Sequence, residues 1–305
     1  MTVKTQFSIK DLENLSGVKA HTIRIWEKRY GLLEPQRTNT NIRQYDLFNL
    51  RKLLNVTFLY NSGYKISKIA KLGKADIQEI IGELSAEQEE NYAIQRFKSA
   101  MFDFDYSLFA ATFEQLKKSK TFGQIFFDVF IPLLNEIGLL WQTGTIDPSH
   151  ERFISELIKQ KLILNIEAKQ RAQETRKKPV FVLYLPYEEI HEIGLLYANY
   201  EILSAGYHSI YLGNHIPIDS LKHVLKHHEE FVFLSYFTVK PDKISVEEYL
   251  NQFHRKIILS KKRRLWLMGA KIVNLNLDKK NPHVSLVRNI EELYVKLKSL
   301  RKSQN

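Results

Sequence analysis

The residues best suited to metal chemistry lie in the run Glu189-Ile190-His191-Glu192-Ile193-Gly194. A neutral imidazole is a good donor to a transition metal, and a nearby carboxylate fixes its tautomer and raises its basicity. Glu189 is close enough in the sequence to do this for His191. Gly194 allows a sharp turn and lets a large flat ligand approach the backbone. A single histidine can equally be a loop residue without a chemical role, and the residue types alone leave both interpretations open.

A second group of histidines, at His223, His227 and His228, is a weaker metal candidate. The i, i+4 spacing places the first two on one face of a helix, as in some zinc sites. No nearby pattern supplies further ligands, so a solvated helix face is the better interpretation. The chain has no cysteine, which excludes disulfides, thiolate zinc sites, iron–sulfur clusters and cysteine nucleophiles.

Positive charge is concentrated in the first quarter of the chain. Residues 1–75 contain nine Lys, five Arg, two Asp and three Glu, a net charge of +9, whereas all 305 residues carry +11. Such a distribution indicates a nucleic-acid-binding module, with a solvated basic face as the alternative. In the segment His21–Gly31, which falls on a helix predicted at Ala20–Arg29, the basic residues lie on one side and Ile23 on the other. A recognition helix in the major groove needs this arrangement.

The elements that must position these residues fall into three regions. At about 100–200 residues per domain, the length predicts two or three domains. Helices are predicted at Ile9–Leu15, Ala20–Arg29, Leu47–Ser62 and Ile66–Leu72, with a strand–turn–strand wing around Pro35. Residues 76–172 are predicted to be helical and to form a four-helix bundle.

Strands and helices alternate after Lys177. Strands are predicted at Val180–Leu185, His208–Leu212, Phe231–Tyr236, Leu265–Met268 and Val284–Val287, with helices between them and a last helix at Ile290–Leu300. This pattern predicts a parallel α/β sheet. Ligands of such sheets bind beyond the carboxyl ends of the strands, where His191 is expected. The predicted domains are therefore 1–75, 76–177 and 178–305.

The N-terminal motifs are Phe7-Ser8-Ile9, Thr22-Ile23-Arg24-x-Trp26-Glu27 and Arg43-x-Tyr45. With them, residues 5–72 resemble the MerR family of winged-helix regulators, and more its light- and cobalamin-related branch than its metal-sensing branch. The resemblance implies double-stranded DNA as a partner. Arg24 and Arg43 are expected to contact phosphates, which sets affinity rather than sequence choice. The DNA-binding candidates are Thr22, Arg24, Trp26, Arg29, Arg37, Arg43 and Tyr45.

The motif Glu189-x-His191-x-x-Gly194 is similar to the Asp-x-His-x-x-Gly signature of cobalamin-binding domains. Over residues 179–300 the resemblance also includes Leu212–Pro217, Leu234-Ser235-Tyr236 and Gly269-Ala270. It implies a flavodoxin-like fold with His191 as the lower ligand of cobalt. Two residues depart from the pattern, because Glu189 replaces Asp and Ala270 replaces Gly. The α/β residues assigned to the cofactor are Glu189, His191, Gly194, Gly213, Ser235, Gly269 and Ala270, of which Gly194, Ser235 and Gly269 allow the dimethylbenzimidazole tail to be buried.

Trp141 is followed after nine residues by Glu151. On residue type alone, these are a bundle aromatic and an acid in the first turn of a helix, favoured by the helix dipole. The spacing resembles the Trp-x9-Glu-His motif in the cap bundle of cobalamin photoreceptor repressors, which implies that both residues cover the upper ligand of cobalt. Arg152 replaces the His of that motif. Gln142 stands where light-sensing members carry another His.

The sequence as a whole predicts a DNA-binding repressor, not an enzyme. A corrinoid, adenosylcobalamin or methylcobalamin, held between bundle and α/β domain would control its assembly as a dimer or tetramer, with light and a protein antirepressor as further inputs. The apolar stretch Phe122–Trp141 carries four polar or charged residues, which argues against a membrane span and favours the cytoplasm. Two alternatives are open: a regulator with a vestigial cobalamin fold that senses a protein partner, and a corrinoid-carrying methyltransferase subunit.

Overall fold

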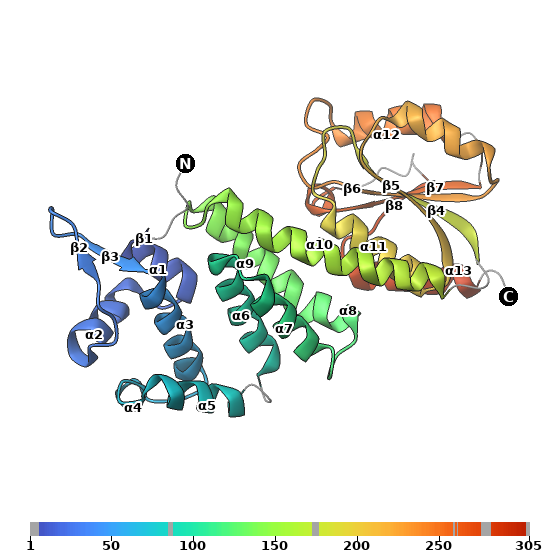
Figure 1. The fold of residues 1–305 in the computed structure, drawn as a ribbon. Coiled ribbons are helices and arrows are strands. Elements are labelled where there is room, and N and C mark those ends of the chain that lie inside the picture. Colours follow the sequence, from blue (N-terminus) through green and yellow to red (C-terminus); the bar gives the residue numbers. More distant parts are fainter. Residues whose placement is uncertain are drawn as a thin grey trace. The chain divides into compact units, whose positions relative to one another are not determined.

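The computed structural model describes residues 6–84, 88–172, 177–258, 260, 262–275 and 282–302. The chain forms two compact units, Met1–Ile158 and Lys159–Asn305, which the ribbon in Figure 1 shows in their order along the sequence. The multidomain fold predicted from the sequence, a winged helix, a helical bundle and a parallel α/β sheet, is confirmed.

The first part of the N-terminal unit is a winged helix. Its elements are β1 (Gln6–Phe7), α1 (Ile9–Ser16), α2 (Ala20–Tyr30), β2 (Gln36–Arg37), β3 (Arg43–Asp46), α3 (Leu47–Asn61) and α4 (Ile66–Ile69). Ser8 and Asp11 form a capping box that begins α1. Gly31, with φ of 62°, ends α2 in the left-handed conformation that glycine adopts without strain. The strands pair antiparallel in the order β1-β3-β2; β1 was not predicted.

A helical bundle follows the winged helix. Helix α5 (Lys74–Leu84) packs against α3, and the bundle itself contains α6 (Glu89–Asp103), α7 (Tyr106–Leu116), α8 (Phe122–Ile125), the π-helical turn η1 (Phe126–Phe130), α9 (Ile131–Gln142) and α10 (Pro148–Arg171). Phe97, Phe109, Phe113 and Phe130 pack ring against ring in its core. Pro132, the second residue of α9, has no N–H for the preceding turn, and the widened π turn ends two residues before it.

The helical stretch Phe122–Gln142 is long and apolar enough to cross a membrane by length and composition alone. Its side chains Val129, Phe130, Leu133 and Ile137 are buried in the bundle. A stretch that supplies the core of a bundle has the same composition as a membrane span. These four residues supply core packing, whereas Phe127, Leu139 and Trp141 of the same stretch are exposed.

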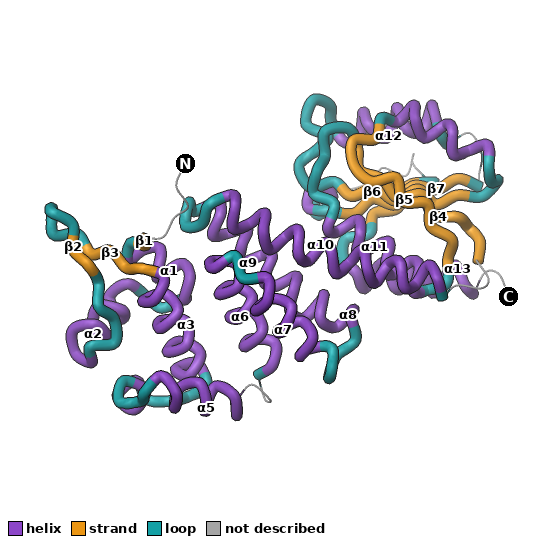
Figure 2. Tube along the Cα trace, viewed as in Figure 1, coloured by secondary structure: helices purple, strands orange, loops and turns teal. Residues whose placement is uncertain are grey.

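The C-terminal unit is a five-stranded parallel sheet in the order β5-β4-β6-β7-β8, the flavodoxin-like order. The strands are β4 (Lys177–Pro186), β5 (Tyr207–Ile216), β6 (Phe231–Tyr236), β7 (Arg263–Met268) and β8 (Val284–Leu286). Helices α11 (Ile193–Ser204) and α13 (Ile290–Lys302) cover one face. The other face is covered by α12 (Val246–Lys256) and the 3-10 helix η2 (Ile218–Lys226), and Figure 2 shows both layers.

The helix predicted between the strands His208–Leu212 and Phe231–Tyr236, at Asp219–His227, is a 3-10 helix instead of an α-helix. Ile218 and Leu221 are buried, and Val224 packs against the same core cluster. These positions repeat every three residues, the period of the 3-10 helix. The repeat therefore puts all three side chains on the sheet, which an α-helix would do less well.

Candidate functional site

The loop after β4 holds a buried carboxylate beside a histidine. The Glu189 side chain is fully buried, and its Oε1 accepts hydrogen bonds from the backbone N–H groups of Ile190 at 2.9 Å and His191 at 3.1 Å. The same oxygen lies 2.5 Å from His191 Nδ1. Its Oε2 accepts three more backbone N–H bonds, from Thr238 at 3.2 Å, Val239 at 2.7 Å and Lys240 at 2.8 Å. Two loops that follow neighbouring strands thus meet at one carboxylate.

These donors keep Glu189 ionised. Burial alone would raise the pKa of Glu189, but the backbone N–H groups of Lys240 and Val239 and the imidazole of His191 outweigh burial and lower the pKa to about 2. Because an ionised carboxylate only accepts hydrogen bonds, Nδ1 of His191 carries a proton, and the neutral form of the ring then has its lone pair at Nε2. The His191 side chain is about half exposed. The arrangement therefore presents one oriented imidazole nitrogen as a donor at the carboxyl end of the sheet.

Gly194 lies in the first turn of α11, against the side chain of Tyr236 at the end of β6. A β-carbon built on Gly194 would lie 2.5 Å from Cζ of Tyr236, 2.7 Å from Cε2 and 2.9 Å from Cε1. A side chain at position 194 would therefore require the Tyr236 ring to shift.

Ser235 and Gly269 are also engaged within the protein. Ser235 is buried and donates its hydroxyl to the carbonyl of Tyr184 at 3.0 Å. A β-carbon on Gly269 would meet the backbone of Phe237, with the carbonyl oxygen 2.4 Å away, and φ at Gly269 is +106°. Gly269 therefore serves the close approach of two strand ends.

The other two assigned positions lie at the edge of this region. Gly213 pairs with Tyr184 next to an irregularity in the β4–β5 register and has φ of +80°, which favours glycine. Ala270 begins the short 3-10 helix η3 (Ala270–Ile272) and is exposed. The extra methyl group at Ala270 therefore meets no core packing.

Trp141 and Glu151 lie at the two ends of the loop that joins α9 to α10. Trp141 is 55% exposed, unusually open for a tryptophan. Glu151 accepts a hydrogen bond from Ser155 at 3.0 Å, and Arg152 Nε lies 4.0 Å from its carboxylate. Both side chains belong to the N-terminal unit, and their assignment to the cofactor stays a prediction.

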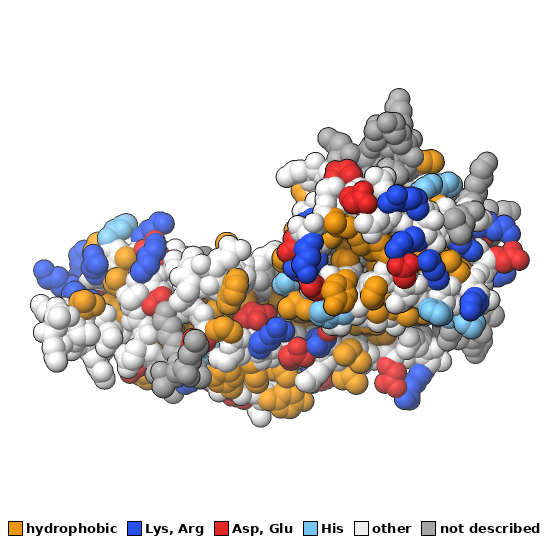
Figure 3. Space-filling view, turned by 90° about the horizontal axis from the view of Figure 1, so that it is seen from above, with side chains coloured by type: hydrophobic (Ala, Val, Ile, Leu, Met, Phe, Trp, Pro, Cys, Tyr) orange, Lys and Arg blue, Asp and Glu red, His pale blue; other side chains and the backbone are white. Residues whose placement is uncertain are grey.

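The predicted DNA-binding residues divide by exposure. Figure 3 shows Lys and Arg side chains gathered at the winged-helix end of the chain, where Arg24, Arg29 and Arg37 are exposed. Trp26 is only 4% exposed and packs edge-to-face on Tyr60. The three exposed arginines are therefore accessible to DNA, whereas Trp26 is not. Thr22 lies half-buried on the same helix.

Glu27 ties the recognition helix to the wing. Its Oε1 accepts a hydrogen bond from Arg43 Nε at 2.9 Å, and its Oε2 accepts a hydrogen bond from the hydroxyl group of the fully buried Tyr45 at 2.8 Å. Burial and the bond to Glu27 raise the pKa of the Tyr45 phenol. Arg43 and Tyr45 therefore orient α2 against β3. Glu27 is absent from the predicted site, although it stands in the motif Thr22-Ile23-Arg24-x-Trp26-Glu27 that supported the resemblance.

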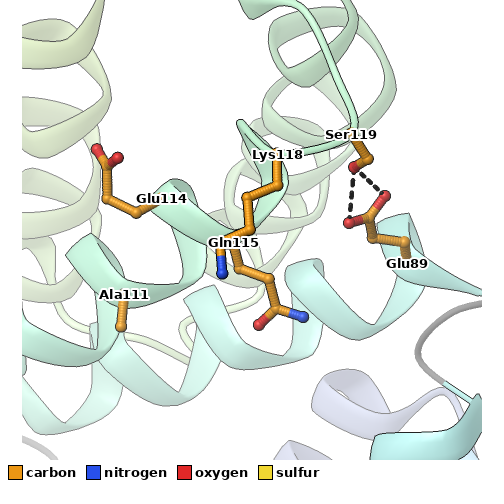
Figure 4. A pocket seen from close by; sticks show the side chains of 6 residues that line it. All are labelled: Glu89, Ala111, Glu114, Gln115, Lys118 and Ser119. Atoms are coloured by element: carbon orange, nitrogen blue, oxygen red, sulfur yellow. Dashed lines mark hydrogen bonds between the residues drawn. The ribbon is translucent and has the colours of Figure 1, made fainter.

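The surface also has an open hollow on the bundle, lined by Glu89, Ala111, Glu114, Gln115, Lys118 and Ser119. In Figure 4 most of the lining side chains come from one helix and the turn after it, and Ser119 bonds to Glu89. None of these residues belongs to the predicted sites.

Known protein families match the winged helix and the helical bundle of this chain. Residues 7–75 match the MerR HTH family regulatory proteins, and residues 93–164 match the B12 binding domain. The HTH-type transcriptional repressor CarH of Myxococcus xanthus is 30% identical over 241 residues, which cover 75% of this chain and 78% of that protein. The chain belongs to the family of CarH-like transcriptional repressors. Cobalamin is accordingly the cofactor that this assignment indicates.

Two further relatives extend the comparison. The HTH-type transcriptional repressor CarA of the same organism is 23% identical over 222 residues, 70% of each protein. The monomethylamine corrinoid protein of Methanosarcina barkeri has a TM-score of 0.56 at 11% identity, and the match covers 70% of this chain and 99% of that one. The similarity to the monomethylamine corrinoid protein concerns only the fold.

The residues present fit cobalamin unequally. His191 offers one neutral, oriented nitrogen, the kind of donor that cobalt takes from a protein. The space beside Gly194, in contrast, is filled by Tyr236. The sequence prediction included Ser235 and left out its neighbour Tyr236. Side chains alternate along β6, so Ser235 and Tyr236 face opposite sides of the sheet, and only this alternation could have pointed to Tyr236.

Proposed function

We propose that this protein is a cobalamin-binding repressor of transcription in which the cofactor controls assembly and DNA binding. The observation that carries the proposal is the Glu189–His191 pair, which leaves one imidazole nitrogen free as a donor in a chain that begins with a MerR-type module. His191 would bind cobalt from below, and Glu189 would hold the proton at Nδ1. The cofactor supplies an organometallic bond on its upper side.

The DNA-binding part of the proposal rests on the exposed arginines of α2 and the wing. Arg24 and Arg37 would contact phosphates of a promoter in double-stranded DNA. A symmetric dimer or tetramer would engage two half-sites together, so that assembly strengthens binding without new contacts. The protein would act in the cytoplasm, where the promoter DNA is, and a protein antirepressor would compete with this assembly.

Cobalamin would bias assembly because it binds one arrangement of the chain better than another. Trp141 and Glu151 enter the proposal as contacts to the upper ligand, adenosyl or methyl. Gln142 and Arg152 stand where light-sensing members carry histidines. We therefore propose that occupancy is the principal signal, and size-exclusion profiles recorded in the dark and after illumination test for an added response to light.

The test is retention of a corrinoid. The full chain is mixed with adenosylcobalamin in the dark, desalted and examined by visible absorbance. We expect a retained corrinoid band whose shape changes in His191→Ala. The matched control is His223→Ala, an exposed histidine in the same unit, which should behave like the unchanged protein. A colourless wild-type protein would contradict the proposal.

Two other functions have specific support. The filled space at Gly194 favours a regulator that senses a protein partner in place of a corrinoid, and that regulator would not respond to His191→Ala. The fold shared with a corrinoid protein favours a methyl-group carrier. A carrier has no use for a recognition helix, so salt-dependent binding to promoter DNA would argue against it.

A further inference from the structure

The side chain of Tyr236 occupies a defined place at the carboxyl end of the sheet. Three carbons of its ring crowd the position where Gly194 would carry a β-carbon, at 2.5, 2.7 and 2.9 Å. Gly194 follows His191 by three residues, in the first turn of α11. The ring therefore fills the space next to the loop that holds the candidate cobalt ligand.

Tyr236 is held there by packing. It lies against the core cluster between the sheet and helices α11 and α13, which includes Leu195, Trp266 and Met268. Burial raises the pKa of its phenol. Its strand neighbour Ser235 faces the opposite side of the sheet and gives its hydroxyl to Tyr184.

A complete cobalamin carries an aromatic base on its nucleotide tail. If His191 takes the lower position on cobalt, this base leaves the metal and needs a place of its own on the protein. The space beside Gly194, which the motif would provide, holds the Tyr236 ring. A base can enter only by displacing the tyrosine from its packing, and that displacement weakens binding.

We propose that Tyr236 is a specificity-determining residue of the corrinoid site, which favours corrinoids without a bulky aromatic base on the tail. The inference rests on the proposed function, since it assumes that a corrinoid binds at His191. Cobinamide, which has the same corrin ring and no nucleotide, would bind without moving Tyr236. Cobalamin would bind more weakly, because part of its binding energy is used to displace the ring.

The experiment compares two ligands across the wild type and variants of Tyr236. Aquacobalamin and diaquacobinamide are titrated into full-length wild type, Tyr236→Ala and Tyr236→Phe, and dissociation constants are read from visible spectra. In wild type we expect cobinamide to bind at least about tenfold more tightly than cobalamin. Tyr236→Ala should tighten cobalamin by about tenfold and leave cobinamide within about threefold. Tyr236→Phe keeps the ring and should match wild type.

The outcomes separate the two levels of the proposal. Equal affinities for both corrinoids in wild type, or no gain for cobalamin in Tyr236→Ala, would overturn the role of Tyr236 and leave the sensor function intact. No spectral change with either corrinoid in any variant would overturn the proposed function itself. Tyr236→Val serves as a second variant that keeps some packing, and thermal melts show that each protein is folded.

Discussion

At the scale of single residues, the departure from aspartate at Glu189 has a structural explanation. The longer side chain lets one carboxylate oxygen stay with the loop of His191 while the other reaches the N–H groups of residues 238–240. A carboxylate that is buried and accepts this many donors is stable only as an anion with all of them in place. The residue thus fixes the histidine and joins two loops.

We expect Glu189→Gln to destabilise the protein. The amide nitrogen of glutamine cannot accept, so one group of N–H donors loses its partner, at a cost of about 1.5–3 kcal/mol. Denaturant unfolding measures this loss, and the affinity for corrinoid should fall with it. The neighbouring Glu188 is the matched control, because its partner Lys243 is an exposed surface charge. Equal unfolding midpoints for Glu189→Gln and Glu188→Gln would contradict the role of Glu189.

His150 in the bundle predicts a dependence of stability on pH. It is almost fully buried between Phe102 and Phe104, and Nδ1 accepts the backbone N–H of Asp147 at 3.3 Å. Burial lowers its pKa, against the smaller opposing effect of Asp147. As the pH falls below the ordinary histidine pKa of about 6.5, the unfolded chain therefore binds more protons than the folded chain. The stability that neutral His150 contributes is lost as the pH falls below this pKa.

The measurement is a series of thermal melts from pH 7.5 to pH 5. The melting temperature of the wild type should fall with acid more steeply than that of His150→Phe, which keeps an aromatic ring and has no proton to bind. His254, exposed on α12, provides the control variant His254→Phe. Parallel pH curves for wild type and His150→Phe would exclude this histidine as the source of acid sensitivity.

At the scale of elements, sequence patterns predicted most helices and strands because their causes are local. Capping residues such as Ser8 and the glycine after α2 act within one turn. Strand β1 could not be predicted, since its two residues are extended only through pairing with β3. The position of the Tyr236 ring and the buried bonds of Lys98 to Leu15 and Glu136 also depend on partners far away in the sequence.

The recognition helix gives a prediction at this scale. Arg24 is exposed on α2, whereas Arg43 is held by Glu27. Arg24→Ala should weaken binding to all DNA sequences alike and reduce the salt slope by about one. Gel-shift titrations at several salt concentrations, with specific and random DNA, measure both quantities. Arg255→Ala, exposed in the C-terminal unit, is the control, and a loss confined to the specific site would instead make Arg24 a base-reading residue.

At the scale of the whole molecule, the loop between α9 and α10 is one physical connection between the predicted cofactor residues and the winged helix. Trp141 and Glu151 flank this loop, and its buried Thr145 bonds to Thr143 at 2.8 Å and receives a hydrogen bond from Asn14 of α1 at 3.0 Å. A ligand that contacts Trp141 and Glu151 would move this loop. The Asn14 bond would then transmit the change to the DNA-binding module, since coupling requires an element that both sites bias.

Asn14→Ala therefore tests whether cofactor and DNA are linked through this contact. We expect its cobalamin affinity to equal that of the wild type, because Asn14 lies outside the cofactor residues. The ratio of DNA affinities with and without cobalamin should move towards one, as expected for a lost coupling free energy. The two titrations are made on the same preparation, with the exposed Asn251→Ala as control. If Asn14→Ala keeps the full ratio, the signal passes through the other contacts of the winged helix, such as Lys98 with Leu15.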